Sequence, residues 1–81
     1  MIWIATFYSH FGAVRFQQSC KAAGIQAKLG PVPRNLSSSC GTCARYECDR
    51  FCPTPAIPQE VEQIVQVLPE GYRVHYRAEN S

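Results

Sequence analysis

The sequence lacks a strong charge of either sign. Eight lysines and arginines stand against six aspartates and glutamates, which leaves a net charge of +2 over 81 residues. No run of basic residues is present, whereas nucleic-acid-binding domains are usually strongly basic on one face. We therefore do not expect the protein to bind nucleic acid.

Long hydrophobic runs are also missing. The apolar residues 1–8 have no basic residues before them and are too few for a signal peptide or a membrane span. We expect a cytoplasmic protein that does not enter a membrane. In that reducing compartment cysteines are more often ligands or catalysts than disulfide partners, and the odd total of five cysteines argues against a complete set of bridges.

The hydrophobic pattern predicts one domain over residues 1–81, beginning with a strand and a helix. Residues 2–8 are apolar on both faces, as in a central strand. Ser9 is placed to cap a helix that runs to about Ala23, and Gly24 ends it. Cys20 lies on the apolar stripe of this helix, where a buried and unreactive thiol is expected. Further strands are expected over 25–29, 42–48 and 72–77.

A second helix is expected before the last strand. Four apolar residues have the spacing of one helical face: Val61, Ile64, Val65 and Leu68. Pro58 suits the first position of this helix, and Pro69 and Gly71 would end it. The order β-α-β-β-α-β predicts an α+β, ferredoxin-like sandwich with two helices on one face of a four-stranded sheet. The first and third strands would then be parallel, and the loop before the third would lie where both helices end.

Four of the five cysteines fall within thirteen residues, at Cys40, Cys43, Cys48 and Cys52. The first two form a Cys-x-x-Cys pair, in which the second thiolate can release what the first has bound. The predicted sheet would place Cys43 on an open face with several cations, which favour a charged thiol. These cations are Arg45, Arg73, His75 and Arg77.

The residues around Cys40 could hold an anion. Backbone N–H groups of a loop can form an anion-binding nest, here over Ser37, Ser38, Ser39 and Gly41. Gly41 would allow a turn with positive φ, and Arg34 would stabilise an anionic adduct on Cys40. In this interpretation the protein needs no cofactor.

The same four cysteines could instead bind zinc or an iron–sulfur cluster. Their spacing, Cys40-x2-Cys43-x4-Cys48-x3-Cys52, lies within the range of four-thiolate sites. A regular third strand would, however, separate Cys40 from Cys48 by roughly 26 Å, at about 3.3 Å per residue. Because ligands of one zinc ion lie within about 4 Å of one another, such a strand and this site exclude each other. A basic sheet face that docks an acidic protein is a third possibility.

Three stretches carry a resemblance to a known family: 31–34 (Pro-Val-Pro-Arg), 36–41 (Leu-Ser-Ser-Ser-Cys-Gly) and 45–46 (Arg-Tyr). They are similar to the motif of a small family of selenium/sulfur carrier-like proteins. The resemblance implies that Cys40 carries sulfur or selenium, as a persulfide or selenide, between a mobilising enzyme and an acceptor protein. The cysteine- and proline-bearing connection at about 48–58 departs from the family pattern and keeps the metal alternative open.

Overall fold

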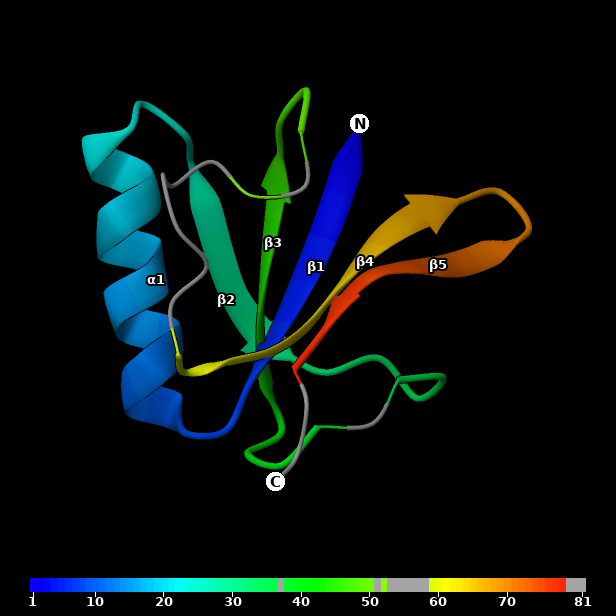
Figure 1. Ribbon diagram of the computed structural model, residues 1–81, viewed down its shortest axis with the longest axis horizontal. Helices are drawn as coiled ribbons and strands as arrows, with labels where there is room; N and C mark the ends of the chain where they lie inside the picture. The colour runs from blue at the N-terminus through cyan, green and yellow to red at the C-terminus, as the bar shows by residue number, and fades with distance from the viewer. Residues whose placement is uncertain (37, 51, 53–58, 79–81) are drawn as a thin grey trace.

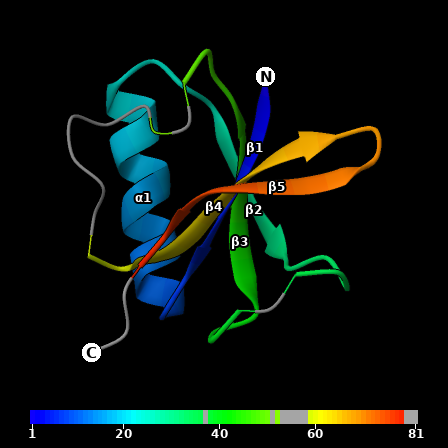
Figure 2. The same ribbon diagram turned by 45° about the vertical axis from the view of Figure 1, so that its right-hand side comes forward.

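A single antiparallel sheet of five strands organises the computed structural model, which describes residues 1–36, 38–50, 52 and 59–78. The elements are β1 (Ile2–Phe7), α1 (His10–Ala22), β2 (Ala27–Pro31), β3 (Thr42–Glu47), β4 (Val61–Leu68) and β5 (Gly71–Arg77). The strands lie in the order β2-β3-β1-β4-β5, and all neighbours are antiparallel. The helix α1 contacts β2, β3 and β1, and the β4–β5 hairpin turns away from it (Figure 1 and Figure 2).

The strand β1 lies at the centre of the sheet because both of its faces are apolar, as predicted. Trp3, Ala5 and Phe7 belong to the helix-side core, the larger cluster of buried side chains that also holds the apolar stripe of α1. On the opposite face Ile4 packs in a second core with Cys43 and Val65. The second core is covered partly by side chains of the segment that follows β2.

The helix α1 begins and ends where the sequence predicts. The Ser9 hydroxyl accepts a hydrogen bond from the Gly12 N–H (3.1 Å), which satisfies one of the unpaired donors of the first turn. Phe16 lies with its ring 5.3 Å from the Phe7 ring and 5.4 Å from the Tyr46 ring, between centroids. Gly24 follows the helix with φ of 81°. The predicted capping residue and stop residue are thus confirmed.

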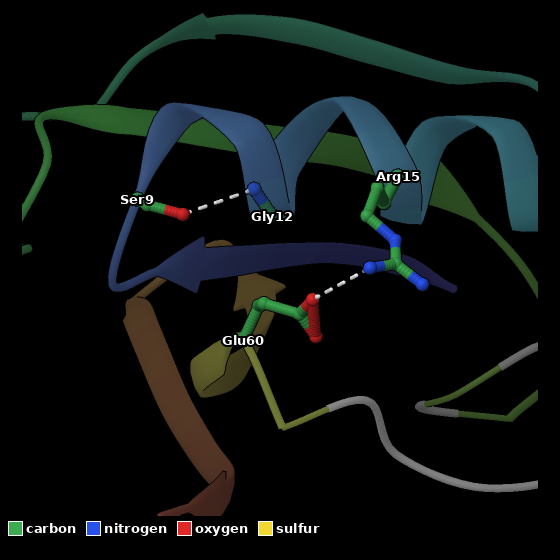
Figure 3. Close-up of polar contacts among 4 residues, drawn as sticks. All are labelled: Ser9, Gly12, Arg15 and Glu60. Atoms are coloured by element: carbon green, nitrogen blue, oxygen red, sulfur yellow. Dashed lines mark hydrogen bonds and ion pairs between the residues drawn. The ribbon is translucent and has the colours of Figure 1, made fainter.

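The first turn of α1 lies directly against the residue that precedes β4 (Figure 3). A Cβ added to Gly12 would clash with the Glu60 Cβ and come within 2.9 Å of its Cγ. The backbone of Glu60 accepts a hydrogen bond from the Tyr8 N–H (3.0 Å). Its carboxylate lies 3.6 Å from the Arg15 guanidinium, across the surface of the helix. Gly12 is therefore required by close packing.

The predicted second helix is wrong, because residues 61–68 form the strand β4. Val61, Ile64, Val65 and Val67 are β-branched, and such side chains favour strands and are restricted in helices. The segment is apolar on both faces because β4 lies between β1 and β5 and contributes Ile64 to one core and Val65 to the other. A two-residue connection, Pro69–Glu70, then joins β4 to β5 as a hairpin.

The ferredoxin-like sandwich is therefore wrong as well. The described residues contain one helix and five strands, and β1 is antiparallel to β3 where the sandwich requires it to be parallel. The other predicted strands exist with small shifts at their ends. Pro58 lies outside the described residues, as does most of the predicted connection at 48–58. No helix in the described part of the chain is long and apolar enough to cross a membrane.

The outer strand β5 contains a bulge. Its residue Tyr76 pairs with Ile64, but Val74 pairs with Val65, so β5 has one extra residue between them. That residue, His75, has its ring edge-on to Trp3, with 4.8 Å between the centroids. It thus lies against a member of the helix-side core, and the prediction that it shares an open face with Cys43 is wrong. The other outer strand, β2, ends at Pro31.

Candidate functional site

The loop that carries Cys40 lies at the end of the sheet where α1 begins (Figure 1). The antiparallel pairing of β1 with β3 places Cys43 opposite Thr6, near the end of β1. His10, the first residue of α1, has its Nδ1 atom 3.3 Å from Thr42 Oγ1. The prediction placed this loop at the opposite end of the helix, because the ferredoxin-like fold requires β1 and β3 to be parallel. The positive end of the helix dipole is therefore on the same side of the molecule as the loop.

Glu62 of β4 holds this loop against the sheet. Its carboxylate accepts hydrogen bonds from the Ser39 N–H (3.1 Å), the Ser39 hydroxyl (2.7 Å) and the Thr6 hydroxyl (3.4 Å). The predicted nest thus already contacts an anionic group, which belongs to the protein itself. Sequence reasoning missed Glu62 because the expected second helix placed it on a solvent-facing side.

Ser38 fastens the loop at a second point. Its hydroxyl donates to the carbonyl oxygen of Phe7 (3.4 Å), at the end of β1. Gly41 has φ of 74°, which confirms the predicted turn, and its carbonyl accepts from the Val32 N–H (3.2 Å). Ser37 lies outside the described residues. The loop is therefore tied to β1, to β4 and to the chain that leaves β2.

Cys40 itself is half-buried. Its side chain packs against the helix-side core, and its Sγ lies 3.6 Å from the Thr42 carbonyl oxygen, to which the thiol can donate. Cys40 is thus held by a fastened loop and is partly exposed to solvent.

Cys43 occupies a different environment from Cys40. Only 5% of it is exposed, in the second core, and its thiol lies 3.5 Å from the Pro31 carbonyl oxygen. Burial raises the pKa of Cys43, the smaller effect of Arg45 lowers it, and the charge of Cys40 raises it further. The effect of Arg45 on the pKa of Cys43 has the predicted direction, but burial outweighs it. Cys40 and Cys43 lie three residues apart in the chain, but their side chains pack against different cores.

Arg34 lies in an exposed turn of the same loop region. The Leu36 N–H donates to the Pro33 carbonyl oxygen (3.0 Å) and closes this turn, which projects from the end of the sheet (Figure 1 and Figure 2). Within the described part of the chain, the Arg34 side chain makes no hydrogen bond or ion pair. Its predicted contact with an adduct on Cys40 stays a prediction.

The four clustered cysteines are not brought together. The strand β3 is regular from Thr42 to Glu47, a span of roughly 17 Å at about 3.3 Å per residue, and Cys40 and Cys48 lie beyond its two ends. Among the described residues, no group of three or more histidine, cysteine or acidic side chains is arranged to hold a metal ion. The four-cysteine alternative therefore has no common ligand site here.

Cys48 and Cys52 lie instead at the other end of the sheet, near Cys20 of α1. All three pack in or against the helix-side core. Burial, followed by the charges of Cys52 and of Cys48, raises the pKa of Cys20 to about 12. None of the five cysteines, each of them among the described residues, is joined in a disulfide. The sequence identified Cys20 as buried but gave no sign that it would lie near the other two.

The comparisons with known proteins agree with the motif around Cys40. Residues 3–55 match a family described as Putative Se/S carrier protein-like, and this range includes β1 from its second residue on, α1, β2, β3 and the Cys40 loop. No curated protein and no solved structure matches the chain. Because the match covers well over half of the 81 residues, the chain belongs to the selenium/sulfur carrier-like family.

Proposed function

We propose that the protein carries sulfur or selenium bound to the Cys40 thiol. The observation that carries this proposal is the contrast between the two thiols of the Cys40-x-x-Cys43 pair, which lies within the family-matched segment. Cys40 is half-exposed on a loop that Glu62 and Ser38 fasten, whereas Cys43 is buried. A carrier thiol must be reached by a donor protein and still keep a fixed position, and Cys40 meets both conditions.

Loading is a transfer between two cysteines. The Cys40 thiolate attacks the outer sulfur of a persulfide on the donor enzyme, and the bond between the two donor sulfurs breaks. The donor leaves as a thiolate, and Cys40 becomes a persulfide with no net oxidation. The positive end of the α1 dipole lies on this side of the molecule and favours the negative charge of the adduct. Selenium would transfer in the same way.

Release can use Cys43. Its thiolate attacks the inner sulfur of the Cys40 persulfide, forms a disulfide with Cys40, and expels hydrosulfide. A dithiol reductant then restores both thiols. Because the two side chains pack against different cores, this step requires the Cys40 loop to shift toward Cys43. Arg34 and the serine loop would steady the anionic adduct before release.

The partners follow from this chemistry. A sulfur- or selenium-mobilising enzyme of the cytoplasm would load the protein, and an acceptor protein would unload it. The proposal includes no metal and no other cofactor.

The test is mass spectrometry of the intact protein after incubation with a cysteine desulfurase and cysteine. We expect an adduct with the mass of one sulfur atom, which a reductant removes. Cys40→Ser should abolish the adduct, whereas Cys48→Ser, the matched change at the other half-exposed cysteine, should keep it. An adduct that persists in Cys40→Ser would refute the proposal. The same assay with free selenocysteine in place of free cysteine as the substrate tests whether the protein also carries selenium, which the mass of the adduct distinguishes from sulfur.

A further inference from the structure

Three cysteines converge at the end of the molecule opposite the Cys40 loop. Cys20 is fully buried, Cys52 is 8% exposed, and Cys48 is half-buried. They come from the last turns of α1, from the residue after β3 and from the chain beyond it (Figure 1). All three contribute to the packing of the helix-side core. This convergence is independent of the loop used in the proposed function.

The shared packing of these thiols in the helix-side core agrees with their electrostatic effects on neighbouring groups. Besides its effect on Cys20, Cys52 is the charged neighbour that most raises the pKa of the buried Tyr46 hydroxyl, after burial itself, followed by Cys20 and Cys48. A charge acts strongly only over short distances in a partly buried site. Cys52, Cys20 and Tyr46 are all buried members of the helix-side core, and Cys48 packs against this core from a half-buried position.

Cys48 is held firmly at this position. Its N–H donates to the Met1 carbonyl oxygen (3.0 Å), and its carbonyl accepts from the Trp3 indole N–H (3.0 Å). Both partners belong to the start of the chain and β1, so the backbone of Cys48 is fixed to the sheet. Its thiol lies 3.6 Å from a carboxylate oxygen of Asp49, to which the thiol can donate a hydrogen bond.

We propose that Cys48 and Cys52 form a second, redox-active thiol pair that reacts with small disulfides such as oxidised glutathione. Cys48 is the entry thiol because it is the most exposed of the three. Cys52 is the resolving thiol because it is buried in the helix-side core against which Cys48 packs, four residues beyond Cys48 in the chain. Cys20 remains a thiol, since its pKa of about 12 leaves very little of the nucleophilic thiolate at neutral pH.

The reaction proceeds in two exchanges. The Cys48 thiolate, formed by loss of the thiol proton to solvent, attacks one sulfur of the small disulfide and expels one small thiolate. The Cys52 thiolate then attacks the Cys48 sulfur of this mixed disulfide and expels the second small thiolate. The two cysteines are oxidised to one disulfide, the small disulfide is reduced to two thiols, and the two protons of the cysteines balance the two thiolates.

The test uses oxidised glutathione, with intact-mass and peptide mapping by mass spectrometry. In the Cys40→Ser/Cys43→Ala variant, which lacks the thiols of the carrier loop, we expect a product lighter by two hydrogens and a peptide link between Cys48 and Cys52. In this same variant background, a further Cys52→Ala change should accumulate one glutathione per protein as a mixed disulfide on Cys48. A further Cys48→Ser change should give neither the mixed disulfide nor the Cys48–Cys52 link. Cys20→Ala should still give the Cys48–Cys52 link.

Two results would overturn this proposal. One is a link from Cys20 to Cys52 as the main product, and the other is no mixed disulfide on Cys48 in a Cys52→Ala protein whose circular dichroism matches the wild type. Neither result bears on the carrier role, because the sulfur-transfer assay reads Cys40 alone. The two proposals therefore fail separately.

Discussion

Glu62 accepts three hydrogen bonds from residues of two different segments. A buried or half-buried carboxylate that accepts several N–H and O–H groups couples the segments that supply them, and hydrogen bonds to charged groups are stronger than neutral ones. At the scale of single residues, this side chain is what keeps the carrier loop in place beside β1.

We expect Glu62→Gln to lower the free energy of unfolding by about 1–2 kcal/mol, because the amide keeps only one of the two acceptor oxygens. Amide hydrogen exchange of Ser39 should become faster in the variant. Urea unfolding and exchange followed by NMR measure both effects. Glu70→Gln, an exposed change in the β4–β5 connection, is the control and should alter stability by no more than about 0.5 kcal/mol. Equal effects of the two changes would refute this role of Glu62.

The buried thiol of Cys20 makes stability depend on pH. Its pKa rises from an ordinary value of 9.0 to about 12 in the folded protein. Between these values the unfolded chain loses the thiol proton and the folded chain keeps it, so stability falls as pH rises. The loss can reach at most about 4 kcal/mol, at 1.36 kcal/mol per pKa unit.

Cys20→Ala should remove this part of the dependence. We expect a smaller decline of the unfolding free energy between about pH 8 and 11 in the variant than in the wild type, measured by urea denaturation. Some decline should remain, because the pKa of Tyr46 is also raised. Parallel curves for the two proteins would contradict the assignment.

At the scale of elements, the contact between α1 and the residue before β4 tests the packing of the fold. Gly12→Ala should destabilise the protein by about 1–3 kcal/mol, because the new methyl group clashes with Glu60. Helix propensity alone predicts the opposite sign, with alanine better by about 1 kcal/mol. Thermal unfolding of Gly12→Ala decides between destabilisation by the clash and stabilisation by helix propensity. The control is Gly30→Ala, where nothing lies within 4 Å of an added Cβ. The second variant should be neutral or slightly stabilised.

The elements with clear local signals were predictable from the sequence. Ser9 and Gly24 marked the ends of α1 through capping and positive φ, and alternation marked β3 and β5. The structure of residues 61–68 was not predictable in this way. Their apolar residues fit one face of a helix as well as a strand that is buried on both sides. The β-branched composition and the short Pro69–Glu70 connection favour the strand, whereas the helical spacing alone does not distinguish a helix from a strand.

The prediction of the candidate site was affected by this one wrong element, the expected second helix. The identity of Cys40 as the candidate carrier thiol, and the turn at Gly41, follow from local sequence and do not depend on the topology. The neighbours of Cys40 do depend on it, because one wrong element reversed β3 relative to β1. Glu62 and the grouping of Cys20 with Cys52 come from pairs of residues far apart in the chain, and no local pattern indicates them.

At the scale of the whole molecule, β3 separates the thiols into two groups. Cys40 and Cys43 lie at one end, and Cys20, Cys48 and Cys52 lie at the other. A disulfide requires Cα atoms within about 7 Å, far less than the length of the strand. We expect oxidation of the folded protein to form links only within each group, as read by peptide mapping. Oxidation in denaturant is the control and should produce links between the groups; such links in the folded protein would refute this topology.

The two outermost strands also limit how copies of the protein can associate. An exposed sheet edge invites another chain to add a strand, unless a proline or an irregularity interrupts its row of backbone donors and acceptors. Here β2 ends at Pro31 and β5 is broken by the extra residue at His75. Growth into fibres is thereby disfavoured at both margins, and a small chain with a large fraction of sheet gains protection against aggregation.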